Sequence, residues 1–264
     1  MANRSILCIA MMVLTLLATV PGTLAQSRER VRTADSISGI NTDRLTSKQL
    51  RIWTKIERIA EAPDKAGRPL HPRLHSLWQW AKASGHTITI EMAERRDPTD
   101  MGGSTTPEQG NSNGLRRAAI LWLQLRVIDH AYVDPAVHRS DGLIPFYRLG
   151  KYERYAEVVG HELTHAFLML ENPEYARLYS EMRMEAAEFL LSQRQSGNGA
   201  AHDDMIRQRH VRLQSMYDRI ERPAEAAELE IWRELRNGRR GGVGASAGMD
   251  SGWTAMLLDM SSGN

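Results

Sequence analysis

Apolar residues recur every three or four positions through much of this chain, and this spacing places them on one side of a helix. Thr46 is a good N-cap for the first of these segments, and Gly85 ends the second. After the third, Asn172 and Pro173 are typical of the start of a new helix. The predicted helices cover residues 46–62, 72–84, 152–170, 173–195, 203–220 and 223–236.

Three other segments alternate between apolar and polar residues and predict strands. Residues 86–92 alternate clearly. Residues 118–133 fit both the helical spacing and the alternation of a strand, and their β-branched residues favour a strand. Residues 143–147 are a third, short candidate. All three precede the helix at 152–170. The pattern therefore predicts an α+β fold that is mainly helical, with a small sheet before that helix and further helices after it.

The N-terminal 25 residues resemble a secretory signal peptide. Arg4 gives a positive start, and residues 6–20 form an uncharged, mostly apolar run that is short for a membrane span. Small residues follow, and we expect cleavage after Ala25. The alternative is an uncleaved N-terminal anchor. Cleavage implies a secreted or periplasmic protein of a bacterial cell, with no stable membrane insertion.

The rest of the chain divides by composition into a linker, one domain and a tail. Residues 26–45 are polar and lack periodicity, so we expect a linker. Residues 46–238 hold the periodic segments and form the predicted domain, and the Gly- and Ser-rich residues 239–264 form a flexible tail. Residues 97–114 form a long loop, and loops of this length are usually functional lids or disordered.

Charge and cysteine content narrow the possible partners and ligands. The net charge is +2 with many charges of both signs, so we expect no nucleic-acid partner. The only cysteine, Cys8, lies in the predicted signal peptide. The mature chain would therefore have no disulfides and no cysteine metal ligands. Nothing in the pattern indicates an oligomeric state.

The segment His161-Glu162-Leu163-Thr164-His165 lies in the middle of the predicted helix 152–170 and fits the pattern H-E-x-x-H. Residues four apart lie on the same face of a helix, so His161 and His165 can bind one metal ion. Glu162 is one step around the helix, where its carboxylate can act on a water molecule beside the metal. The motif predicts one Zn²⁺ per chain.

A catalytic zinc site normally has three protein ligands and one open position, so a third ligand is needed. A metzincin would have Gly and His where this chain has Leu168 and Glu171. A cysteine ligand is excluded if the signal peptide is removed. The third ligand is therefore expected to be a carboxylate from a later helix.

The motif resembles the active-site helix of the gluzincin metallopeptidases, the thermolysin-like superfamily. That resemblance implies a zincin-like domain, zinc and hydrolysis of peptide bonds. It carries over His161 and His165 as metal ligands and Glu162 as the general base. It also implies a downstream glutamate as third ligand, for which we favour Glu225. This residue lies in the first turn of the helix predicted to begin at Pro223, and its Ala-Glu-Ala setting resembles the ligand segment of several gluzincin branches.

Other glutamates remain candidates for the third ligand. Glu185 lies twenty residues after His165, the interval of the thermolysin-like enzymes, and Glu228 and Glu188 are further alternatives. The chain also departs from the thermolysin family proper, which has an aspartate four residues after its glutamate ligand. Leu229 or Phe189 stands at that position here. We therefore expect a divergent branch of the gluzincins.

The same superfamily uses a downstream His or Tyr to stabilise the oxyanion. None follows Glu225, so the candidates are His210 and Tyr217. The sequence thus predicts an exported zinc metallopeptidase that hydrolyses a peptide or protein with a zinc-bound water and Glu162 as general base. We expect the strand at 86–92 or 118–133 to flank the cleft. The alternatives are a zinc-binding pseudo-peptidase or binding module of the cell envelope, and a metallohydrolase of a non-peptide amide.

Overall fold

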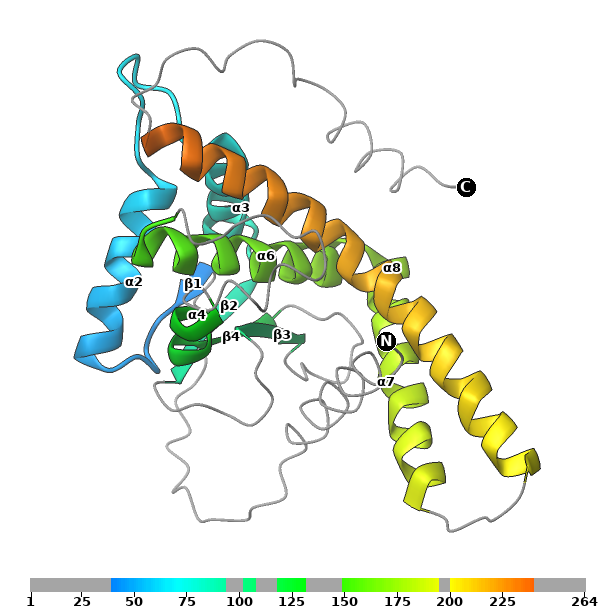
Figure 1. Cartoon of the computed structure of the whole chain (residues 1–264). Coiled ribbons are helices and arrows are strands. Elements are labelled where there is room, and N and C mark those ends of the chain that lie inside the picture. Colours follow the sequence, from blue (N-terminus) through cyan, green and yellow to red (C-terminus); the bar gives the residue numbers. More distant parts are fainter. Residues whose placement is uncertain (1–38, 94–101, 108–117, 132–148, 195–199, 240–264) are drawn as a thin grey trace.

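The computed structural model describes five stretches of the chain, namely residues 39–93, 102–107, 118–131, 149–194 and 200–239. They form a mixed α/β structure that is mainly helical (Figure 1). The elements are β1 (Gly39–Asn41), α2 (Ser47–Ala60), α3 (Pro72–Ala83), β2 (Thr87–Ala93), β3 (Gly103–Pro107), β4 (Ala118–Gln124), α4 (Leu125–Ala131), α6 (Lys151–Glu171), α7 (Pro173–Arg194) and α8 (Ala200–Arg239). The predicted mixed fold, with a small sheet ahead of the motif helix, is confirmed at this level.

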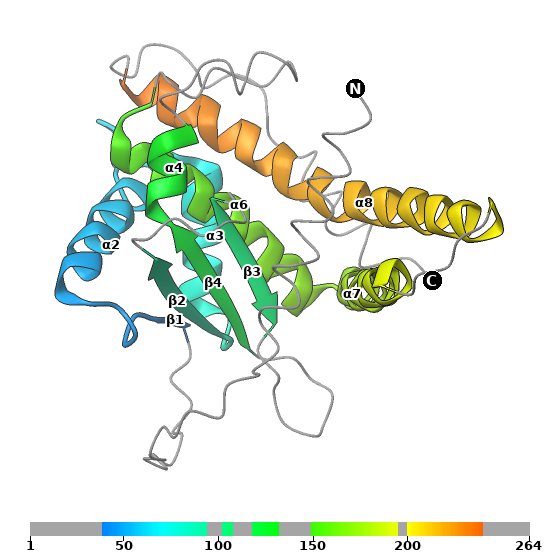
Figure 2. The ribbon, with the colours of Figure 1, turned by 60° about the horizontal axis from the view of Figure 1, so that its bottom comes forward.

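The sheet has the strand order β1-β2-β4-β3 (Figure 2). The first three strands are parallel, and β3 pairs with β4 in the antiparallel direction at one edge. Strand β2 buries Ile88 and Ile90, and β4 buries Leu121 and Leu123, because alternate side chains share a face. The long helix α6 packs on this sheet and carries the motif.

Two hydrophobic clusters hold the described residues together. The body cluster joins the sheet to α2, α3, α6 and the C-terminal half of α8. The arm cluster joins the end of α6 to α7 and the N-terminal half of α8, and the pair formed by α7 and α8 extends away from the body in Figure 1. Helix α8 therefore belongs to both clusters. No helix among the described residues is long and apolar enough to cross a membrane.

Two strands lie where the sequence predicted irregular structure. Strand β1 falls in the predicted linker 26–45, and β3 falls in the predicted loop 97–114. The predicted strand 118–133 is only half right, because β4 ends at Gln124 and α4 follows at once. The predicted signal peptide, the strand at 143–147 and the tail beyond Arg239 lie outside the described residues.

The prediction of two separate helices near the C-terminus was also wrong. The two helices expected at 203–220 and 223–236 are one helix, with Pro223 inside it. A proline within a helix removes one hydrogen bond and costs about 3 kcal/mol. Packing offsets that cost here, because Ile220 and Ala224 are buried on either side of the proline. Pro223 therefore does not begin a helix.

Candidate metal centre

Helix α6 carries the motif through the middle of the molecule. Its N-terminus is capped by Glu153, whose carboxylate accepts a hydrogen bond of 2.6 Å from the backbone N–H of Gly150. Gly160, just before the motif, allows α8 to lie close. A Cβ atom at that position would be 2.4 Å from Ile231 Cδ1 on α8. The two helices therefore cross closely beside His161.

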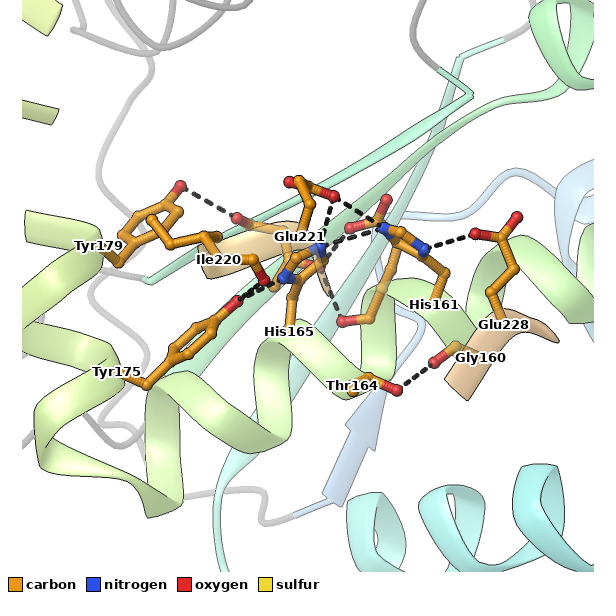
Figure 3. A network of polar contacts seen from close by, with 11 residues as sticks. Gly160, His161, Thr164, His165, Tyr175, Tyr179, Ile220, Glu221 and Glu228 are labelled. Atoms are coloured by element: carbon orange, nitrogen blue, oxygen red, sulfur yellow. Dashed lines mark hydrogen bonds and ion pairs between the residues drawn. The ribbon is translucent and has the colours of Figure 1, made fainter. Parts of the chain in front are cut away.

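Three side chains converge at this crossing (Figure 3). The Nε2 atoms of His161 and His165 are 3.0 Å apart. Each lies 3.3 Å from Oε2 of Glu221, which comes from α8. All three side chains are largely shielded from solvent, with exposed fractions of 16%, 9% and 16% respectively. The three atoms form a nearly equilateral triangle.

The other ring nitrogen of each histidine donates to a fixed partner. His161 Nδ1 lies 2.8 Å from Oε2 of Glu228, and a carboxylate oxygen accepts the proton of this contact. His165 Nδ1 lies 2.6 Å from the hydroxyl of Tyr175, which itself donates to the Ile220 carbonyl at 3.1 Å. Since that hydroxyl has one proton, its oxygen accepts from His165. Both rings therefore carry their proton on Nδ1 when neutral.

With Nδ1 protonated in both rings, the positions of the donor atoms can be compared with those of a metal site. Both Nε2 atoms then direct a lone pair at the same point, together with a carboxylate oxygen, and this donor set attracts a cation. Zinc ligands at about 2.0–2.1 Å in a tetrahedral arrangement would be separated by about 3.3 Å. The observed separations of 3.0 and 3.3 Å are close to that value. Glu228 and Tyr175 supply the outer hydrogen bonds that usually orient metal-binding histidines.

Without a metal ion, a proton on His161 takes the place of a cation beside Glu221. Burial alone lowers the pKa of His161, but hydrogen bonds to Glu221 and Glu228 outweigh it and raise that pKa well above its ordinary value. Burial raises the pKa of Glu221, but the nearby charge of His165 and hydrogen bonds from both histidines lower it far more. The site therefore stabilises positive charge next to Glu221.

The side chain of Glu162, on α6, is buried against strand β3, with an exposed fraction of 4%. The hydroxyl of Thr105 lies 2.7 Å from its Oε2 atom. Burial raises the pKa of Glu162, while the charges of the two histidines and the Thr105 hydrogen bond oppose that rise. A buried carboxylate with a raised pKa, next to a candidate metal site, has the properties of a general base.

The structure brings His161, Glu162 and His165 together as the motif predicts, but the third member of the cluster is Glu221. Glu225 is exposed and is not among the three converging residues. Two features place Glu221 in the cluster where Glu225 was expected. Pro223 does not start a helix. On α8, Glu221 points about 60° away from the buried Ala224 and Glu225 about 100° away, so Glu221 lies nearer the buried side. We therefore replace Glu225 by Glu221 as the candidate ligand.

The remaining candidates have other partners. Glu185 forms ion pairs with Arg209 and Arg212 in the arm, and Glu188 also pairs with Arg209. Glu228 contacts the site through His161 Nδ1, so it holds the ring of a candidate ligand.

The two residues proposed to stabilise an oxyanion lie on the arm half of α8. The ring of His210 is 6.3 Å from that of Phe189. Tyr217 packs against the arm cluster. Neither contact supports a role for these two residues in stabilising an oxyanion.

Comparison with known proteins identifies no relative: no protein-family model matches the chain, and neither the curated proteins nor the solved structures contain a significant match.

Replacing Tyr175 by phenylalanine is expected to weaken zinc binding by about 10- to 100-fold, the usual effect of losing an outer hydrogen bond to a metal ligand. The ring would still pack, but His165 Nδ1 would lose its acceptor. A competition titration with a chromophoric chelator measures this affinity. Tyr179→Phe is the matched control, because that hydroxyl donates to the backbone carbonyl of Thr105. Equal zinc affinity in Tyr175→Phe and wild type would contradict the prediction.

Proposed function

We propose that this chain is a zinc-dependent metallopeptidase with a zincin-like fold, a divergent member of the gluzincins. In this proposal His161, His165 and Glu221 hold the zinc ion and Glu162 is the general base. The observation that carries it is the convergence of two Nε2 atoms and a carboxylate oxygen. A second buried carboxylate, that of Glu162, lies on the same turn of α6.

Each residue has a chemical task in this proposal. When bound, zinc lowers the pKa of a coordinated water and polarises a carbonyl group. Glu162 takes a proton from the attacking water at its carboxylate and delivers it to the leaving amine. Tyr175 and Glu228 hold the two histidines in the tautomer that leaves Nε2 free. Burial of Glu162 favours proton uptake because it raises the pKa of the carboxyl.

Strand β3 is the element that an extended substrate would join. Gln124 N–H donates to the Gly102 carbonyl at 2.9 Å, so that opposed pair is hydrogen-bonded. In an antiparallel ladder such pairs alternate, and the backbone groups of Gly103 and Thr105 therefore face away from β4. The Thr105 carbonyl accepts a hydrogen bond from Tyr179. A peptide can add to an edge strand that has no second strand partner among the described residues. Strands β2 and β4, which we expected to flank the cleft, both have neighbours on either side.

Export is part of the proposal and depends on the apolar segment within residues 1–25. The competing functions remain a zinc-binding pseudo-peptidase and a hydrolase of non-peptide amides. The intact Glu162 favours an active enzyme over the first. The position of β3 at the edge of the described sheet favours a peptide substrate over the second.

The test of this function uses residues 26–264, purified and analysed for metal. We expect about one zinc per chain and cleavage of a broad peptide library, detected by mass spectrometry. A strong chelator should abolish cleavage, and added zinc should restore it. A zinc-loaded protein that cleaves no peptide would contradict the peptidase assignment. Absence of zinc after reconstitution would show that the motif is accidental.

A further inference from the structure

The carboxylate of Glu162 lies against one face of strand β3. Successive residues of a strand point to opposite faces, so Gly103 and Thr105 share the face directed at α6. A Cβ atom at position 103 would be 2.6 Å from Oε1 of Glu162. Any side chain there would displace the carboxylate. The strand thus leaves space for Glu162 at one residue and supplies a hydroxyl two residues later.

The hydroxyl of Thr105 has two possible acceptors, both in Glu162. It is 2.7 Å from Oε2 and 2.9 Å from the backbone carbonyl. Its single proton favours the carboxylate, because hydrogen bonds to a charged acceptor are the stronger ones. Among the described residues, Thr105 is the side chain shown to donate to this carboxylate. The bond leaves Oε1 without such a donor.

We propose that Thr105 is a positioning residue for the general base: it holds Oε2 of Glu162 so that Oε1 is the oxygen that receives the proton of the attacking water. This inference depends on the proposed peptidase function. Thr105 also belongs to the edge that an extended substrate would join, and Tyr179 holds its backbone carbonyl with a hydrogen bond of 3.2 Å. The same residue therefore connects the position of the substrate backbone to the orientation of the base.

The test compares Thr105→Val, Thr105→Ser and Thr106→Val. Valine keeps the shape of threonine and removes the hydroxyl, whereas serine keeps the hydroxyl. Thr106 is the matched control, because it lies on the same strand with its side chain on the opposite face. We expect Thr105→Val to lower kcat by about 10- to 100-fold, with KM changed less than about threefold. Thr105→Ser and Thr106→Val should stay within about threefold of wild type in both constants.

Zinc content and Tm are measured for every variant as readouts independent of turnover. One zinc per chain and a Tm near that of wild type in Thr105→Val would show that only the base is affected. An unchanged kcat in Thr105→Val, a serine variant as slow as valine, or an equal loss in Thr106→Val would overturn the inference. A wild-type protein that binds zinc but cleaves nothing would instead refute the peptidase function itself.

Discussion

Glu221→Ala is expected to lose zinc almost completely, with affinity falling by more than about 100-fold, because even an outer partner of a ligand contributes 10- to 100-fold. The carboxylate of Glu221 is the only one in the converging group of three, and its loss leaves the two histidines alone. Peptide cleavage should fall with the metal. Zinc per chain after dialysis, followed by a chelator competition, measures the effect directly.

Glu225→Ala is the matched control for that experiment. It removes the same side chain one turn later on α8, from an exposed position outside the converging group. We expect this variant to bind zinc as wild type does. Loss of zinc in Glu225→Ala with retention in Glu221→Ala would restore Glu225 as the ligand. Retention in both would show that no glutamate from this part of α8 binds the metal.

Glu162→Gln is expected to keep one zinc per chain and to lower kcat by about 100- to 10,000-fold, the range that a general base contributes. Glutamine has nearly the same shape, and its amide oxygen can still accept from Thr105. It cannot take up the proton of the attacking water. The measurement is kcat at saturating peptide, with zinc determined in the same sample.

Glu171→Gln provides the comparison for Glu162→Gln, because Glu171 lies on the same helix and its exposed carboxylate bonds Trp80. It should cleave peptide at the wild-type rate. A Glu162→Gln variant that retains more than about a tenth of wild-type kcat would refute the role of Glu162, since a base contributes at least about 100-fold. A variant that loses zinc together with activity would assign Glu162 to metal binding.

Helical periodicity predicted most of this fold, because packing of an apolar stripe is a local property of the sequence. The bounds of α2 and α3 were predicted to within a few residues, and the N-terminus of α2 is capped by Thr46 as expected. Strand β3 was missed because Gly-Ser-Thr-Thr-Pro has no apolar alternation. Its backbone pairing with β4 determines the structure there, and such pairing leaves no signal in a short polar segment.

Glu221 was not predicted as a member of the cluster for a related reason. A proline often starts a helix, but packing on both sides of Pro223 keeps α8 continuous. One signal could have identified Glu221. It lies seven residues before Glu228, and the two share the side of α8 that contains Ala224. Both glutamates then reach His161.

The outer contacts of the site could not have been predicted from one sequence. Tyr175 and Tyr179 lie one turn apart on α7, and their hydroxyls reach His165 and Thr105 respectively. Each contact joins segments that meet only after the helices and the sheet have packed. A tyrosine that packs in a core and one that orients a ligand have the same sequence pattern.

Glu221 and His165 come from helices that are far apart in the sequence, so an ion between them would link distant parts of the chain. His165 lies on α6 and Glu221 on α8, and all of α7 and the N-terminal half of α8 lie between them in the sequence. An ion held by both residues would act as a reversible cross-link at the base of the arm. A cross-link of this kind reduces the entropy of the unfolded chain, and it does so more for a longer enclosed segment. The proposed zinc ion would thus also attach the arm to the body.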